Sequence, residues 1–166
     1  MALTYIYTGA ILVLSLVIQG NSSFDVIKVA GVKPDLLFVS IVYFGYTFGP
    51  FYGEVTGFIG GLFHDSISGF ILGLLTLPKV LIGFAIGFLS RSFLRQNPLT
   101  VFILVFGASI VKGLLTIMLC FAFHEASVSD IISIIIPESF YNAVLAPFIF
   151  MLFDKLFDPD IERSGY

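Results

Sequence analysis

The sequence predicts an all-α protein that lies in a membrane as a bundle of about six transmembrane helices. Hydrophobic residues make up 58% of the chain and charged residues only 11%, whereas about a quarter of the residues in a soluble domain are charged. The mean hydropathy of +1.05 agrees with this class. At about 20 residues a span, the chain has length for one bundle and no second domain, so we expect residues 1–166 to form a single integral membrane domain.

Glycine, proline and charged residues divide the chain into six apolar segments, namely 3–18, 34–49, 50–64, 72–93, 99–123 and 137–157. The first lacks a basic flank and a small-residue cleavage site, so we expect it to be retained as a helix. The second should begin at Pro34 and Asp35, because proline suits a first helical turn and a carboxylate there meets the helix dipole. Pro78 should either begin or kink the fourth segment.

The chain near its C-terminus contains two further features. Residues 127–136 are short and apolar, and Ser127 and Asp130 have capping-box spacing. We therefore predict a separate re-entrant or interfacial helix there, ahead of a sixth span that starts near Pro137 and Glu138. Residues 158–166 are expected to form a charged cytoplasmic tail.

The orientation follows from the basic residues of the loops. With six spans and the N-terminus inside, four basic residues are cytoplasmic and two, Lys28 and Lys33, are outside. This majority predicts that both termini are cytoplasmic. The four cytoplasmic residues are Arg91, Arg95, Lys155 and Arg163.

Four ionisable residues fall inside the predicted spans, where each charge is costly and needs a reason. They are Glu54, Asp65, Lys79 and Lys112. Glu54 should lie in the first turn of its helix, stabilised by the dipole. Asp65 and Lys79 should lie at one depth and form an ion pair between the third and fourth helices. Lys112 lies at mid-span and needs a carboxylate or carbonyl partner; Asn142 is either that partner or an ordinary interhelical hydrogen bonder.

Small residues mark two helix faces. Gly57 and Gly61 share a face with Glu54 and Asp65, and Gly83 and Gly87 follow Lys79 at four-residue spacing. Such faces allow helices to approach closely. They are candidates for packing within the chain or for docking a partner protein, and we favour internal packing for Gly57 and Gly61 because the two helices are consecutive.

Enzyme signatures are missing from the sequence. His124 and Glu125 lack the second histidine of a zinc protease motif, and there is no nucleophile elbow or phosphate-binding loop. Cys120 is the only cysteine, which excludes an internal disulfide and a CxxC site. No basic run indicates nucleic-acid binding. We therefore predict no catalytic, cofactor or metal site and no nucleic-acid partner.

The order of several motifs resembles a known family. PDLL at 34–37 is followed by GEVTGFIGGL at 53–62, DSISG at 65–69, GFAIGF at 83–88 and YNAVLAP at 141–147. With the length and the number of spans, this succession is similar to the rod-shape-determining protein MreD family over residues 34–157. The chain departs from the family's pattern at Lys79 and Lys112, where apolar residues are expected.

The resemblance implies a non-enzymatic scaffold of the bacterial inner membrane that acts in the cell-elongation complex. It implies binding to an MreC-like single-span membrane protein, with the wall synthase of RodA and a transpeptidase, and with MreB, as further partners in peptidoglycan synthesis. It also implies a fold similar to the six-helix substrate-binding component of energy-coupling-factor transporters.

The residues leave a second function open: a small-molecule transporter or a substrate-binding membrane subunit. In that case the four ionisable residues of the spans would line a polar cavity at depth. A scaffold needs an apolar or small-residue outer strip, whereas a carrier needs polar groups that converge on an enclosed space. The lining of any internal cavity therefore distinguishes the two.

Overall fold

The protein was analysed as a computed structural model, which describes residues 2–21, 28, 31–69, 71–93, 97–123 and 128–164. Within these residues the chain forms six α-helices, which confirms the all-α prediction. They are α1 (Ala2–Gly20), α2 (Leu36–Phe48), α3 (Pro50–Ser68), α4 (Thr76–Phe93), α5 (Pro98–Phe123) and α6 (Val128–Ser164).

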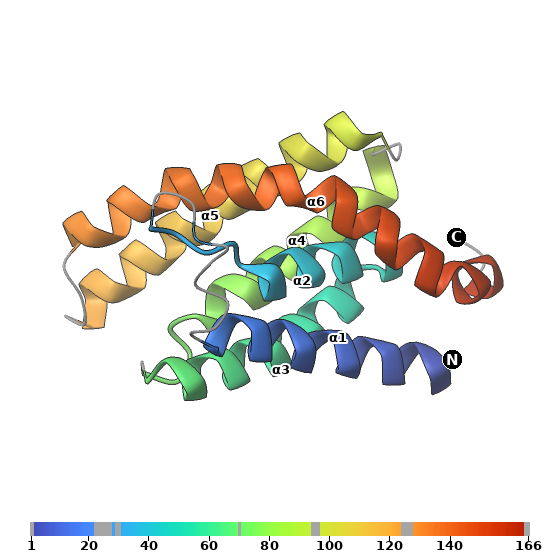
Figure 1. Ribbon diagram of the computed structural model, residues 1–166, viewed down its shortest axis with the longest axis horizontal. Helices are drawn as coiled ribbons and strands as arrows, with labels where there is room; N and C mark the ends of the chain where they lie inside the picture. Colours follow the sequence, from blue (N-terminus) through green and yellow to red (C-terminus); the bar gives the residue numbers. More distant parts are fainter. Residues whose placement is uncertain are drawn as a thin grey trace.

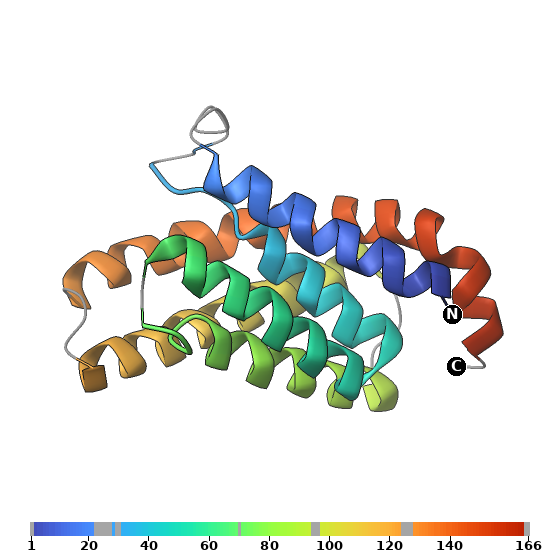
Figure 2. The same ribbon diagram turned by 90° about the horizontal axis from the view of Figure 1, so that it is seen from below.

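Helix α2 is the centre of the bundle. It contacts α1, α3, α4 and α6 (Figures 1 and 2), and every residue from Leu37 to Tyr46 is buried. Its sequence is apolar all round, which is the pattern of a helix surrounded by others. At 13 residues it is about 20 Å long, shorter than a bilayer core. Its backbone ends must therefore find partners inside the protein.

Helices α3 and α4 pack with their backbones in close contact. A methyl group added at Gly57 would lie 2.8 Å from the Lys79 carbonyl oxygen, and one at Gly61 would lie 2.6 Å from Thr76 Cα. The glycines Gly53, Gly83 and Gly87 leave even less room. The small-residue faces of both helices are therefore occupied by each other.

The α5–α6 hairpin reaches beyond the other helices at the end away from the chain termini (Figures 1 and 2). The prediction of a separate helix at 127–136 was wrong, because α6 runs unbroken from Val128 through Pro137 to Ser164; Ser127 lies outside the described residues. α6 packs against α5, and its helix continues through Pro137. Residues 158–164 continue α6 as helix, and their place in a charged cytoplasmic tail stays a prediction.

Two of the described helices are long and apolar enough to cross a membrane, α5 and the part of α6 from Ser133 to Phe157. Shorter apolar helices cover Thr4–Gly20, Leu36–Phe48 and Thr76–Ser90. The first residues of α1 and the last of α6 lie at the same end of the bundle (Figure 1). This arrangement is compatible with both termini on one side of a membrane, whereas the count of six spans stays a prediction.

Candidate functional site

A buried carboxylate, Asp35, lies at the N-terminus of the central helix. It is the N-cap of α2, and its Oδ1 accepts hydrogen bonds from the backbone N–H of Phe38 at 2.9 Å and from Gln19 Nε2 at 2.8 Å. The backbone N–H of Asp35 donates to Asn142 Oδ1 at 2.8 Å. These bonds satisfy groups that a helix end leaves without partners. Asp35 therefore ties α1 and α6 to the start of α2.

Lys112 is the second member of the site. Its ammonium donates to Asp35 Oδ2 at 2.8 Å and also to Glu138 Oε1 from α6. The same nitrogen lies 4.9 Å from the centre of the Phe38 ring, in a cation–π position. Lys112 thus has two carboxylate partners. Asn142 is an interhelical hydrogen bonder instead, because its Nδ2 donates to Ser109 Oγ at 3.3 Å.

Lys79 approaches the same carboxylate from α4. Its ammonium lies 3.6 Å from Asp35 Oδ2, and the residue is only 1% exposed. The predicted ion pair with Asp65 was wrong. Although Asp65 and Lys79 lie on adjacent helices, Asp65 is turned toward the connection before α4 and Lys79 toward α2.

Asp65 has a capping role that the sequence did not indicate. Its carboxylate accepts hydrogen bonds from the backbone N–H groups of Gly73, Leu75 and Thr76 at 2.8, 2.8 and 3.2 Å, and from Thr76 Oγ1 at 2.5 Å. These are the donors around the N-terminus of α4, where a negative charge also meets the helix dipole. Asp65 therefore fastens the end of α3 to the start of α4.

Glu54 does not belong to the site. It lies just past the first turn of α3 and is exposed, while Gly57, Gly61 and Asp65 are buried. The predicted strip therefore divides into a buried part against α4 and an exposed carboxylate. Of the four ionisable residues, the structure brings only Lys79 and Lys112 together, around Asp35.

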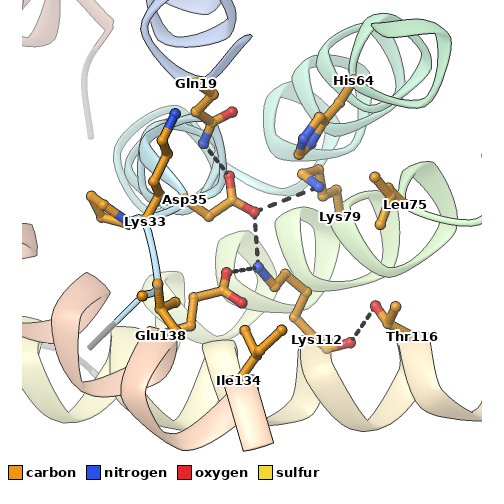
Figure 3. A pocket seen from close by; sticks show the side chains of 13 residues that line it. Gln19, Lys33, Asp35, His64, Leu75, Lys79, Lys112, Thr116, Ile134 and Glu138 are labelled. Atoms are coloured by element: carbon orange, nitrogen blue, oxygen red, sulfur yellow. Dashed lines mark hydrogen bonds and ion pairs between the residues drawn. The ribbon is translucent and has the colours of Figure 1, made fainter. Parts of the chain in front are cut away.

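A pocket of about 350 Å³ opens beside this cluster (Figure 3). Besides Asp35, Lys79, Lys112 and Glu138, it is lined by His64 of α3 and Gln19 of α1. Within the described residues, His64 Nδ1 and Gln19 Oε1 are buried without a hydrogen-bond partner. The connection before α2 supplies Lys33, and Leu75, Thr116 and Ile134 complete the wall that Figure 3 labels.

The charges of the cluster cancel, since two carboxylates face two ammonium groups. A compensated cluster can persist in a low-dielectric interior, whereas a single charge there is very costly. No group of three potential metal ligands gathers in the part of the chain that the structure describes. The arrangement can join helices and present polar groups to a pocket, and it contains no nucleophile activated by an adjacent base.

The sequence analysis missed the acidic half of the site. Asp35 and Glu138 were recognised only as helix starts, each directly after a proline. The signal that could have revealed them was the balance of charge: Lys79 and Lys112 needed two acids at their depth. His64 and Gln19 gave no such signal, because a lone polar residue in an apolar segment has many possible partners.

The comparisons with known proteins identify the family of this chain. No match was found among curated proteins or among solved structures, so the likeness to the energy-coupling-factor transporter component stays a prediction. A family model described as rod shape-determining protein MreD matches residues 2–158. These residues include helices α1 to α5, all but the last turns of α6, and all members of the charged cluster. The chain therefore belongs to the MreD family of membrane proteins, which act in rod shape determination.

Proposed function

We propose that this chain is a non-enzymatic scaffold of the bacterial inner membrane that binds an MreC-like single-span protein. In this role it supports peptidoglycan synthesis and rod shape, together with the RodA–transpeptidase synthase and MreB. Membership of the MreD family supports the proposal most directly. The cluster supports a structural role, because its hydrogen bonds and ion pairs join α1, α2, α4, α5 and α6.

The partner helix needs a surface that is not already used. The glycine faces of α3 and α4 pack against each other. They are therefore not free to dock a partner, although the sequence had made them candidates for that role. Exposed apolar side chains remain on α1, α3, α4, α5 and α6, for example Leu14 of α1 and Met118 of α5. Because helix association in lipid depends on close packing, any of these apolar faces can receive the partner helix, and we choose those of α1 and α5 for the first test.

Site-specific photo-crosslinking tests this proposal. A photoreactive residue is placed at Leu14 or at Met118, and the full-length chain is expressed with a tagged MreC-like protein of the same cell. A crosslink to the partner's membrane helix from one position, with no crosslink from the other, is the expected result. Failure of the two proteins to co-purify would contradict the scaffold proposal.

The orientation is part of the same proposal. With Cys120 first replaced by alanine, single cysteines at Asn97 and Glu125 should be labelled from opposite sides of the membrane, because they lie in consecutive connections on either side of α5. Cytoplasmic labelling is expected at Asn97 and external labelling at Glu125. Labelling of both from one side would contradict six spans with both termini in the cytoplasm.

A second function, a substrate-binding membrane subunit, is favoured by one observation: polar groups from five helices converge on the pocket. A scaffold that only packs helices does not need such a space. A pocket does not require transport, however, and a scaffold with a bound ligand fits both observations. The chemistry of the pocket then decides what that ligand is.

A further inference from the structure

The hydrogen-bonding groups of the pocket are used unequally. Asp35 Oδ1 accepts two hydrogen bonds, and its Oδ2 faces both lysines. Lys112 donates to two carboxylates. Lys79, in contrast, lies 3.6 Å from Asp35 Oδ2, a distance at which the two charges attract each other but form no hydrogen bond. Since an ammonium has three N–H donors, Lys79 can donate to a group inside the pocket.

Two further atoms beside Lys79 lack a hydrogen-bond partner. They are Gln19 Oε1 of α1 and His64 Nδ1 of α3, and both are buried without a partner among the described residues. Figure 3 shows these side chains and Lys79 around one side of the pocket. Because a buried polar atom without a partner is costly, this side favours a ligand that can both accept and donate hydrogen bonds.

The charges of the pocket are already balanced. The two carboxylates of the cluster face its two ammonium groups. Lys33 at the rim has partners of its own, among them the Asn21 carbonyl oxygen at 3.2 Å. Asp35 is 7% exposed and Lys79 only 1%, so a charged ligand beside them would bring an uncompensated charge into a poorly hydrated interior. The balance therefore favours a neutral ligand.

Hydroxyl groups meet both requirements, because each one accepts and donates hydrogen bonds without carrying a charge. One hydroxyl can accept from Lys79 while it or its neighbour donates to Gln19 Oε1. The volume of about 350 Å³ is many times the roughly 30 Å³ share of one water molecule, so a molecule with several hydroxyl groups has room. Leu75 and Ile134 in the wall offer apolar contact to its C–H groups.

We propose that the pocket binds a neutral polyhydroxylated molecule of the polyol or sugar type. Lys79 is the donor to its hydroxyl groups, Gln19 Oε1 is the acceptor, and His64 Nδ1 bonds a further hydroxyl. This inference rests on the second function proposed above, that of a substrate-binding subunit, and names the class of its ligand. It does not depend on the capture of an MreC-like protein.

Protection of a thiol in the pocket wall tests the site. Cys120 is replaced by alanine, and Ile134→Cys places the reporter in the wall, where the isoleucine is 43% exposed. The full chain is placed in phosphatidylcholine nanodiscs, which contain no sugar, and its reaction with N-ethylmaleimide is followed. Glucose and glycerol are the probes. Each should slow the reaction until the effect saturates, whereas Leu114→Cys, exposed on α5 outside the pocket, should react at an unchanged rate.

Two charged sugars test the neutral class. Glucosamine and glucuronate keep the ring of glucose and add one positive or one negative charge. We expect half-maximal protection by glucose at a concentration at least about tenfold lower than by either charged sugar. Equal or better protection by a charged sugar would overturn the assignment of a neutral ligand.

Variants assign the protection to the proposed groups. Lys79→Met should raise the concentration of glucose for half-maximal protection at least about tenfold, because a charged hydrogen-bond donor is lost. Gln19→Leu provides a second test if the first variant folds poorly. Lys155→Met, an exposed lysine of α6 outside the pocket, is the matched control and should behave as the wild type.

Three results would overturn the site itself. They are protection that survives in both pocket variants, equal slowing at the reporter and at the Leu114 control, and no protection by either probe. The chain is measured alone, so these results are independent of whether an MreC-like protein co-purifies with it.

Discussion

The α3–α4 interface and the Asp35 cluster hold the same bundle together by opposite means. At the interface, glycines bring two backbones together, and the charged Asp65 contacts α4 only at its N-terminus. At the cluster, four charged side chains meet and leave a pocket of about 350 Å³ beside them. In lipid the hydrophobic effect does not drive helices together, so close packing and polar contacts remain. The comparison shows that close packing leaves no space for a ligand, whereas a polar contact can leave one.

The largest effect is expected at the centre of the cluster. Asp35→Ala leaves Lys79 without its carboxylate, weakens the pairing of Lys112 and removes the cap of α2. Breaking a buried ion pair costs about 3–5 kcal/mol, and loss of a cap adds about 1 kcal/mol. Asp35→Asn keeps a capping side chain but not the charge, so it should recover only the contribution of the cap, about 1 kcal/mol. Unfolding in mixed micelles with increasing dodecyl sulfate measures the stability of both variants. If Asp35→Ala and Asp35→Asn are equally stable, the cap of α2 does not contribute to stability.

Asp65→Ala should come next, because it leaves three backbone N–H groups at the start of α4 without an acceptor. We expect a loss of about 3 kcal/mol in the free energy of unfolding. Adding Lys79→Met should not restore stability, since Lys79 pairs with Asp35. Rescue by the double substitution, measured by the same titration, would show that Asp65 and Lys79 interact after all.

The close packing of α3 against α4 is tested by adding a single methyl group at one of its glycines. Gly53→Ala forces the new Cβ against the Gly83 backbone, which cannot move aside as a flexible side chain would. A loss of about 1–3 kcal/mol is expected from overpacking. Gly107→Ala is the matched control, because a Cβ there meets nothing within 4 Å, and helix propensity predicts a gain of about 0.5–1 kcal/mol. The two variants should therefore move the unfolding midpoint in opposite directions.

Lys79→Met should have the smallest effect on stability. Asp35 keeps Lys112, Gln19 and the Phe38 N–H as partners, so no buried charge loses its last partner. We expect a change of at most about 1 kcal/mol, since a well-packed apolar residue often replaces a buried ion without loss. A loss as large as that of Asp35→Ala would mean that Lys79 is essential to the cluster, and its role in a ligand site would need another variant.

The sequence by itself determined the class of the protein, five of its helices to within a few residues, and the internal use of Gly57 and Gly61. Apolar segment length, glycine spacing and proline positions are local features, and they fix local structure and the need for lipid.

Only the tertiary structure decided which charges meet. Asp35 and Lys112 are 77 positions apart, and a carboxylate at a helix start is equally compatible with capping, pairing or exposure. Which of these three roles the carboxylate takes depends on which helices are its neighbours. The arrangement of neighbouring helices is set by the packing of the whole chain. The same packing made Asp65 a cap of α4 instead of a partner of Lys79 and joined residues 128–136 to α6, because contacts along a neighbouring helix outweigh a local proline signal.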